Sequence, residues 1–313
     1  MRYRTFGRTG LSVSTVSLGG NRLGDPGVDP AVWPPIVQRA LRLGVNLFDT
    51  SVSYNQGRSE TILGEVLSGH PRPTYLSTKV GFNIDFEVGP ELATRDYSAR
   101  AILRDVDGQL ARLRRDAIDL YMLHSPKLSD LEAGDWATTI DALKRQGRVR
   151  WFGISTSDHA SGVWAIQRGA DLLQVEYDLL APTAEDELLP LAQRQNVGIM
   201  VRTPLARGLL TGKFKRGSPI PPEQQWRRPK GDQLELRLAR IEELSFLERP
   251  GQTLGQAALR FVLAHPAVHC VVPGARTLEQ LEANVPAADA DLNPEELSRI
   301  KALHARWRAE GRW

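Results

Sequence analysis

Eight short apolar runs, separated for the most part by helix-like segments, limit the fold of this chain more than any other feature. The runs span residues 13–19, 45–49, 75–79, 118–124, 149–155, 172–177, 197–202 and 268–273. Between them, segments such as 101–113 and 138–146 carry apolar residues at the spacing of one helix face. Strands that are apolar on both faces and alternate with helices are typical of a parallel sheet, and eight of them close into a barrel. The pattern therefore predicts an α/β fold, a (β/α)8 TIM barrel.

Several segments lie outside this repeat. Residues 2–5 and 11–14 flank a glycine-bounded turn, which predicts an N-terminal β-hairpin able to plug one end of the sheet. The interval after the seventh run is long and holds a basic segment rich in Gly and Pro, a charged helical stretch and a further helix, at residues 211–230, 233–247 and 254–264. For the first of these, a loop over a binding site and a disordered loop are both open. Asn293 before Pro294 predicts the start of a last helix, so we expect extra C-terminal helices.

The length and composition narrow the class of protein. The 313 residues suffice for two average domains or one large barrel, and the absence of a linker favours a single domain over residues 1–313. The net charge is +3 and the arginines are spread among acids, so we do not expect a nucleic-acid partner. The single cysteine, Cys270, lies in an apolar run, which predicts a buried thiol and a reducing compartment.

The apolar stretches are too short for membrane insertion. None approaches the roughly 18 residues of a transmembrane helix, and the N-terminus lacks the apolar core of a signal peptide. We therefore expect a cytoplasmic protein, a monomer or homo-oligomer, with no membrane partner. We assign no metal ligand.

Polar residues lie at or near the ends of the apolar runs. In barrels of this type the active site lies at the carboxyl ends of the strands, so these residues are the candidates for it. They are Asp49, Lys79, His124, Ser155, Gln174 and Arg202. A charge that ends an apolar run must be paired or face a cleft. For Asp49 alone, a structural cap at the start of a loop is an equally good interpretation.

Asp49, Tyr54, Lys79 and His124 together would form a proton-transfer site. A free tyrosine holds its proton too tightly to be a ready donor near neutrality, and a neighbouring ammonium favours release of that proton. Lys79 would supply the ammonium, Asp49 would keep it charged, and His124 would orient the substrate oxygen. Because no side chain is an obvious attacker of the carbonyl carbon, hydride from a nicotinamide is the natural candidate.

These residues belong to a longer series of motifs that resembles the aldo-keto reductase family. The matching pieces lie at 48–50 with Tyr54, 57–60, 77–79, 123–126, 153–155, 174–177, 203–213 and 272–277, with Gln280 and Asn284 after them. The resemblance implies a catalytic tetrad of Asp49, Tyr54, Lys79 and His124, with Tyr54 as the general acid. It implies the cofactor NADP(H) and a small carbonyl or alcohol substrate, including sugar-type substrates.

The resemblance also implies a set of cofactor contacts. Ser155 and Gln174 would hold the nicotinamide carboxamide, the loop from Thr203 to Lys213 would wrap the pyrophosphate, and Arg276 would meet the adenosine 2′-phosphate. The complete expected set is Gly20, Asn21, Ser155, Gln174, Arg202, Thr203, Pro204, Leu205, Gly208, Lys213, Gly274, Arg276, Gln280 and Asn284.

The chain departs from common family patterns at three places. Arg202 stands where an aromatic residue often stacks on the nicotinamide, and Thr156 stands where Asn or Arg is frequent. Gly274 and Ala275 replace a Lys-Ser pair, so Arg276 would carry more of the phosphate recognition. For the substrate pocket, we expect an aromatic lining from Trp33, Phe82 and Trp226.

Two alternatives to a carbonyl reductase come from other classes of protein. The first is an NADP(H)-binding regulatory subunit, like the potassium-channel β subunits that resemble this family. His124 argues against it, because those subunits carry a different residue there. The second is a Schiff-base aldolase, which would need a neutral Lys79, whereas Asp49 favours the ammonium.

Overall fold

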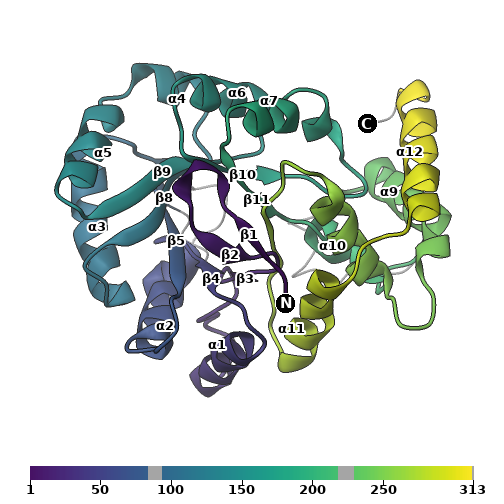
Figure 1. Ribbon diagram of the computed structural model, residues 1–313, viewed down its shortest axis with the longest axis horizontal. Helices are drawn as coiled ribbons and strands as arrows, with labels where there is room; N and C mark the ends of the chain where they lie inside the picture. The colour runs from purple at the N-terminus through teal and green to yellow at the C-terminus, as the bar shows by residue number, and fades with distance from the viewer. Residues whose placement is uncertain (84–93, 218–228, 312–313) are drawn as a thin grey trace.

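The computed structural model describes residues 1–83, 94–217 and 229–311, and its centre is a parallel eight-stranded sheet (Figure 1). In spatial order the strands are β12 (Cys270–Val272), β11 (Gly198–Arg202), β10 (Leu172–Glu176), β9 (Val149–Thr156), β8 (Ile118–His124), β5 (Tyr75–Val80), β4 (Leu47–Asp49) and β3 (Leu18–Gly19). Parallel bridges join Val16 to Val271 and Gly19 to Gly274, which brings the two edges of the sheet together. The predicted (β/α)8 barrel is confirmed.

Helices surround this sheet in the order expected for a barrel (Figure 1). The outer ring comprises α1 (Trp33–Arg42), α2 (Arg58–Leu67), α3 (Ala99–Leu113), α4 (Leu128–Ala133), α5 (Trp136–Arg145), α6 (His159–Gln167), α7 (Leu188–Arg194), α10 (Leu254–Ala264) and α11 (Leu278–Asn284). Two more helices, α9 (Asp232–Glu243) and α12 (Pro294–Ala309), lie side by side outside the ring. Asn293 caps α12 by accepting from the Glu296 amide, so the predicted extra C-terminal helices are present.

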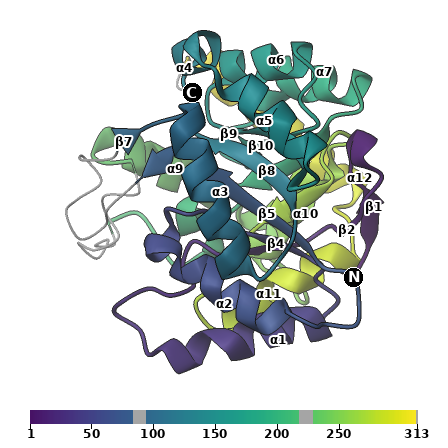
Figure 2. The same ribbon diagram turned by 90° about the vertical axis from the view of Figure 1, so that its left-hand side faces the viewer.

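The N-terminal hairpin closes one end of the barrel. Its strands β1 (Tyr3–Thr5) and β2 (Ser12–Ser14) pair antiparallel, as predicted. Between them Phe6 is fully buried in the cluster of side chains that fills the barrel interior. A Cβ added to Gly198, at the start of β11, would lie 2.6 Å from the Phe6 ring, so only glycine leaves room for it. In Figure 2 the hairpin and the short strand β7 (Thr94–Arg95) lie at opposite sides of the molecule.

One strand prediction was wrong in its extent. Residues 13–19 were expected to form a single strand, but the structure divides them between β2 of the hairpin and β3 of the barrel. Between the two, the Thr15 amide bonds to the Arg2 carbonyl, whereas the Ser17 amide and hydroxyl bond to the Val271 carbonyl. The backbone therefore changes its hydrogen-bond partners at this point, because the first part of the run belongs to the N-terminal hairpin and the second part to the barrel sheet.

Trp33, which the sequence led us to expect in the lining of the substrate pocket, lies in the core instead. It is the first residue of α1 and is 1% exposed, packed in the layer between the helices and the sheet. Pro34 and Pro35 are tolerated in a first helical turn, so the helix begins directly at Trp33. Its buried face then continues with Ile36, Val37, Ala40 and Leu41. Trp33 is thus part of the core and not of the substrate pocket.

In the described ranges, none of the helices has the length and apolar character that a membrane crossing requires.

Candidate active site

An ion pair buried inside the barrel lies at the carboxyl ends of β4 and β5. Lys79 Nζ is 2.8 Å from each carboxylate oxygen of Asp49, and the Lys79 side chain is fully buried. Ser77, two residues before Lys79 on the same face of β5, donates to Asp49 Oδ1 at 2.5 Å. A buried charge is tolerated when it is paired and hydrogen-bonded, and both conditions are met here.

The remaining contacts of Lys79 reach the loop that carries Tyr54. Besides Asp49, the ammonium donates to the Thr50 carbonyl at 2.8 Å and lies 3.5 Å from the Tyr54 hydroxyl. An ammonium has three N–H donors, and Asp49, Thr50 and Tyr54 account for them. Tyr54 opens the turn η3 (Tyr54–Gly57), in which Asn55 and Gln56 adopt positive φ. The turn thereby holds the phenol beside the ammonium.

His124 ends β8 on the other side of Tyr54. The two rings meet edge to face at 5.8 Å, and the Phe82 ring packs edge to face on His124 at 5.3 Å. Burial lowers the pKa of the His124 imidazole well below its usual range, and the cations Lys79, Arg202 and Arg95 lower it further. The ring is therefore neutral at physiological pH. All four residues of the predicted tetrad meet in one place.

Ser155 and Gln174 join this cluster from β9 and β10. Ser155 donates to Gln174 Oε1 at 2.9 Å, and Gln174 Nε2 donates to Asp49 Oδ1 at 2.9 Å. Both side chains are buried and lie beside the tetrad. A nicotinamide carboxamide that bound to Ser155 and Gln174 would add to the hydrogen bonds that these side chains already make with each other and with Asp49.

The segment after β11 forms an irregular turn at the mouth of the barrel. Thr203, Ala206 and Arg207 have positive φ, and the chain continues into η6 (Ala206–Thr211). Pro204 is buried, Leu205 half-buried, and Lys213 exposed after the turn. Gly208 also has positive φ, at 90°. Inside this turn the Ala206 and Gly208 amides donate to the Thr203 and Leu205 carbonyls, both at 2.8 Å.

Arg202 and Arg207 share one carboxylate at this mouth. Their guanidinium groups lie 3.4 and 3.2 Å from Glu176 Oε1. Glu176 and Arg202 face each other in the register of β10 and β11. The Arg202 Nε is buried and has no hydrogen-bond partner within the described ranges. Arg202, predicted to lie beside the nicotinamide, is therefore paired with Glu176.

The far end of the predicted cofactor site lies between β12 and α11. Asn21 Oδ1 is 3.0 Å from the place of a Cβ on Gly274, and Asn284 Nδ2 donates to the Gly274 carbonyl at 3.5 Å. Gln280 Oε1 accepts from the Arg276 amide at 2.8 Å. The Arg276 side chain is exposed, and its guanidinium makes no ion pair or hydrogen bond with the described residues.

Gly20 lies between this end and the tetrad. A Cβ at Gly20 would lie 2.6 Å from Ser59 Oγ and 2.9 Å from the Asp49 carbonyl oxygen, so the position accepts only glycine. Gly20, directly after β3, therefore packs against the end of β4, and its amide donates to the Asp49 carbonyl at 2.7 Å.

The substrate side of the site is only partly described. Phe82 lies in β6 (Phe82–Asn83), with the Arg95 guanidinium carbon 5.0 Å from its ring centroid. Trp226 falls outside the described residues. Of the two predicted aromatic residues that the structure describes, Phe82 contacts His124 and Trp33 lies in the core.

Sequence reasoning missed several described residues whose side chains contact the tetrad. Ser77 bonds to Asp49, Ser51 and Ser53 contact His124 Nδ1, and the Tyr97 hydroxyl donates to the His124 carbonyl at 2.8 Å. For Ser77 a signal was present, because it lies two residues before Lys79 and alternate residues of a strand share a face. The other three contacts depend on tertiary structure.

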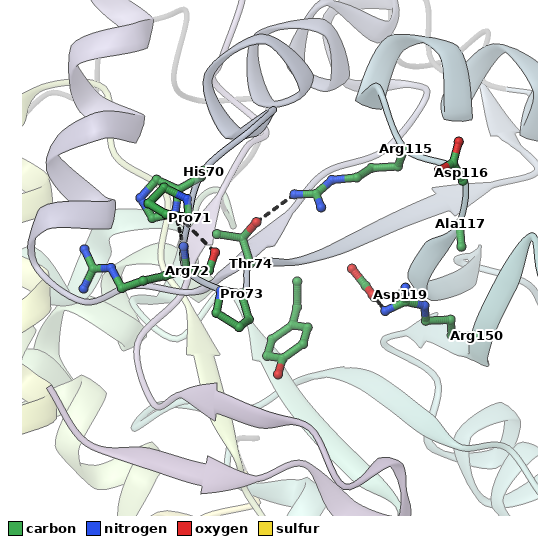
Figure 3. Close-up of a pocket in the computed structure, with 11 residues that line it drawn as sticks. His70, Pro71, Arg72, Pro73, Thr74, Arg115, Asp116, Ala117, Asp119 and Arg150 are labelled. Carbon is green, nitrogen blue, oxygen red and sulfur yellow. Dashed lines mark hydrogen bonds and ion pairs between the residues drawn. The ribbon is translucent and has the colours of Figure 1, made fainter.

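A separate cavity of about 450 Å³ lies at the opposite, amino-terminal end of the strands (Figure 3). Two of the arginines that line it are bonded to neighbouring side chains. Arg115 donates to Thr74 Oγ1 at 2.7 Å, and Arg150 pairs with Asp119 at 2.8 Å. This cavity has no contact with the tetrad.

Comparisons with known proteins agree with this geometry. The model of the aldo/keto reductase family matches residues 15–305. The uncharacterized oxidoreductase YqkF of Bacillus subtilis (strain 168) is 31% identical over 97% of this chain and 96% of its own length. A putative voltage-gated potassium channel subunit beta of Schizosaccharomyces pombe is 31% identical over 96% and 92%. The NADH-specific methylglyoxal reductase of Escherichia coli (strain K12) is 28% identical over 96% and 95%.

Solved structures give the same result. The holo form of aldo-keto reductase AKR11C1 from Bacillus halodurans matches with a TM-score of 0.81 and 31% identity, over 97% of this chain and 96% of that chain. The glycerol dehydrogenase AKR11B4 from Gluconobacter oxydans matches with a TM-score of 0.79 and 26% identity, over 95% and 93%. The chain belongs to the aldo/keto reductase family, whose members are oxidoreductases that use nicotinamide cofactors.

Proposed function

We propose that this protein is an NADPH-dependent carbonyl reductase that reduces aldehydes or ketones to alcohols, reversibly, with Tyr54 as the general acid. The observation that carries the proposal is the position of Lys79 between Asp49 and Tyr54. All three ammonium donors are directed by the surrounding groups, so its charge is fixed beside the Tyr54 hydroxyl. A fixed, desolvated cation stabilises the phenolate that remains after the phenol has given up its proton.

The proton inventory of the reaction is simple. The nicotinamide cofactor supplies a hydride to the carbonyl carbon when it is bound. As the carbon gains that hydride, the carbonyl oxygen gains negative charge and takes the proton of Tyr54. The neutral His124 ring, edge to face with Tyr54, supplies a hydrogen bond that orients the carbonyl oxygen. In the direction of alcohol oxidation the Tyr54 phenolate takes the proton back.

The residues around the mouth fit a dinucleotide. Gly274 leaves space beside Asn21, and the irregular turn from Thr203 to Arg207 is where the pyrophosphate would lie. The buried, unpartnered Nε of Arg202 adds a donor at the same mouth. These observations support cofactor binding across the carboxyl ends of β11, β12 and β3.

Arg276 supports NADPH as the preferred cofactor. Its exposed guanidinium has no partner in the described part of the chain, and its backbone amide donates to Gln280 Oε1. An arginine in this state is suited to a 2′-phosphate, which NADH lacks. One relative, from E. coli, is named as NADH-specific, so the affinities for NADPH and NADH must both be measured.

The names of the relatives suggest where to look for substrates. They include a methylglyoxal reductase, an L-galactose dehydrogenase of Arabidopsis thaliana and a glycerol dehydrogenase. We therefore propose short carbonyl compounds in the reductive direction and polyols or sugars in the oxidative direction.

A fluorescence titration with NADPH and NADH, followed by turnover assays with aldehydes, ketones and sugars, tests the function. We expect tighter binding of NADPH and loss of the reduced-nicotinamide absorbance with at least one carbonyl. Tight binding without turnover across a broad panel would favour a regulatory subunit. Failure to bind either cofactor would overturn the assignment.

A further inference from the structure

We propose that Ser51 and Ser53 are positioning residues whose hydroxyls hold His124 in the tautomer with its proton on Nε2. The ring then presents a hydrogen-bond donor, and not a lone pair, to the substrate oxygen. This inference rests on the proposed function, because it specifies how the same site prepares His124 for a carbonyl substrate.

The two serines form a compact hydroxyl pair beside one ring nitrogen. Ser51 Oγ is 3.0 Å from His124 Nδ1 and 2.9 Å from Ser53 Oγ, while Ser53 Oγ is 3.4 Å from the same Nδ1. The Ser53 amide donates to Ser51 Oγ at 3.3 Å. Ser51 is fully buried and Ser53 is 5% exposed, so the protein and not the solvent decides where these protons lie.

Counting hydrogens favours one arrangement of the pair. If Ser51 donates to His124 Nδ1, then Ser53 donates to Ser51, and both hydroxyl protons have an acceptor. If instead Nδ1 carries a proton and donates to Ser51, then Ser51 donates to Ser53. The Ser53 proton is then left without an acceptor in the described part of the chain. An unsatisfied buried hydroxyl is costly, so the first arrangement is favoured.

The surroundings of the His124 ring keep it neutral, so the position of its one N–H proton determines which nitrogen can donate. Charged groups face it from several elements: Lys79 from β5, Arg202 from β11 and Arg95 from β7. Together with burial they keep the imidazole neutral, so only one of its two nitrogens carries a proton. Nε2 makes no hydrogen bond with the described residues, which leaves it available to a substrate.

The two hydroxyls therefore determine whether Nε2 of His124 presents an N–H donor or a lone pair to the substrate. With the proton on Nε2, the ring stabilises the negative charge that develops on the carbonyl oxygen. With the proton on Nδ1, the Nε2 lone pair would repel that oxygen. Second partners that fix a histidine tautomer are a recognised requirement for its function.

Nitrogen NMR of the imidazole rings tests the tautomer directly. The chain has six histidines, and the spectrum of His124→Gln identifies the His124 signals by their loss. With NADPH bound, we expect the native protein to show an unprotonated Nδ1 and a protonated Nε2. In Ser51→Ala we expect the Nδ1-protonated form to appear. A native His124 with its proton on Nδ1, or a tautomer unchanged in Ser51→Ala, would overturn the proposal.

Kinetics provide a second measure with a matched control. In Ser51→Ala we expect kcat/KM for the carbonyl to fall about tenfold, with Ser53→Ala less affected, and the NADPH Kd to stay the same. The control is Ser14→Ala, which removes an equally buried hydroxyl from the hairpin at the other end of the barrel. Equal losses in Ser51→Ala and Ser14→Ala would show a general packing effect and contradict the positioning role.

The two experiments separate this inference from the proposed function. If the native protein reduces carbonyl substrates but the tautomer is unaffected by Ser51→Ala, the positioning role fails and the reductase assignment stands. If the native protein reduces none of the carbonyls, the assignment fails, whereas the NMR spectrum still decides how Ser51 and Ser53 act on His124.

Discussion

The two ends of the barrel each hold an aspartate paired with a basic residue, yet the pairs are built differently. At the carboxyl end, Lys79 is 0% exposed beside Asp49, whereas at the amino end Arg150 is 58% exposed beside Asp119. Both pairs have the same closest distance of 2.8 Å. A solvated cation loses little when its partner is removed, but a buried ammonium without a partner is strongly destabilising. Burial of both charges, and not their pairing, marks the end suited to chemistry.

The neighbours of the two pairs differ in the same way. Lys79 reaches Tyr54, and His124 lies against Tyr54, while Ser155 and Gln174 continue the polar cluster. At the amino end the interior is sealed by Phe6, and the cavity in Figure 3 lies outside that seal. In the described part of the chain, the polar cluster around Asp49 and Lys79 therefore lies at the carboxyl end, whereas an apolar cluster that includes Phe6 lies below the hairpin.

We expect the largest difference between the two ends when a tyrosine hydroxyl is removed from each and turnover is measured. Tyr54→Phe removes the proton donor, so turnover should fall by roughly 10²- to 10⁴-fold while the NADPH Kd stays nearly constant. Tyr75→Phe is the matched change at the amino end, because Tyr75 lines the other cavity. We expect it to leave turnover unchanged. Steady-state assays with both variants measure the contrast, and unchanged turnover in Tyr54→Phe would break it.

Neutralising each aspartate separates the two ion pairs by stability as well as by turnover. Asp49→Asn leaves the Lys79 ammonium buried without a counter-charge, so we expect a loss of about 3–5 kcal/mol in the free energy of unfolding and little residual turnover. Asp119→Asn leaves Arg150 in solvent, so the loss should be about 1 kcal/mol or less and turnover should persist. Urea unfolding of both variants provides the measurement. Equal losses would show that burial does not distinguish the two ends.

Arginine substitutions sharpen the contrast in cofactor binding. We expect Arg276→Ala to weaken NADPH by roughly ten- to a hundredfold, since charge-assisted hydrogen bonds contribute about 1.5–3 kcal/mol, and to leave NADH almost unaffected. Arg72→Ala, at the amino-terminal cavity, should change neither affinity. Fluorescence titrations compare the four Kd values. Similar losses for NADPH and NADH in Arg276→Ala would mean that Arg276 does not bind the 2′-phosphate.

The pH dependence gives the smallest expected difference. Burial lowers the pKa of His124 at the carboxyl end, and burial beside Arg4 lowers that of His269 at the hairpin to about 4. A histidine whose folded pKa is lowered stabilises the fold above its unfolded value of about 6.5, and this contribution is lost as pH falls from there toward the folded pKa. Unfolding stability should therefore decline below about pH 6.5.

Turnover should behave differently from stability over the same range. Because His124 stays neutral below its usual pKa, kcat per folded molecule should hold as pH falls through about 6.5. His269→Gln should weaken the decline in stability without moving the acid limb of turnover. Parallel unfolding and rate profiles test this, and an acid limb that shifts in His269→Gln would contradict the separation of the two ends.

The barrel and the meeting of Asp49, Lys79 and His124 at one end of it were predictable because their signals are local. Each apolar run is read from consecutive residues, and Asp49, Lys79 and His124 each close such a run. The parallel topology then brings strand ends to one edge, so the convergence of these three side chains follows from the fold.

Other features depended on tertiary contacts and could not be read locally. Ser51 meets His124 across 73 positions of sequence only because β4 and β8 belong to one closed sheet. Trp33 was expected in the pocket lining, but it is the first residue of α1 and packs in the core. The run 13–19 changes partners midway, and no periodicity marks that change.

Transfer of deuterium from labelled NADPH tests the central claim most directly. The protein would be incubated with NADPH deuterated on either face of the nicotinamide C4 and with an accepted aldehyde, and the alcohol analysed by mass spectrometry. We predict deuterium on the former carbonyl carbon from one face alone, at a rate that falls steeply in Tyr54→Phe and holds in Tyr75→Phe. Product without deuterium from either face, or equal rates in Tyr54→Phe and the native protein, would contradict hydride transfer with Tyr54 as the acid.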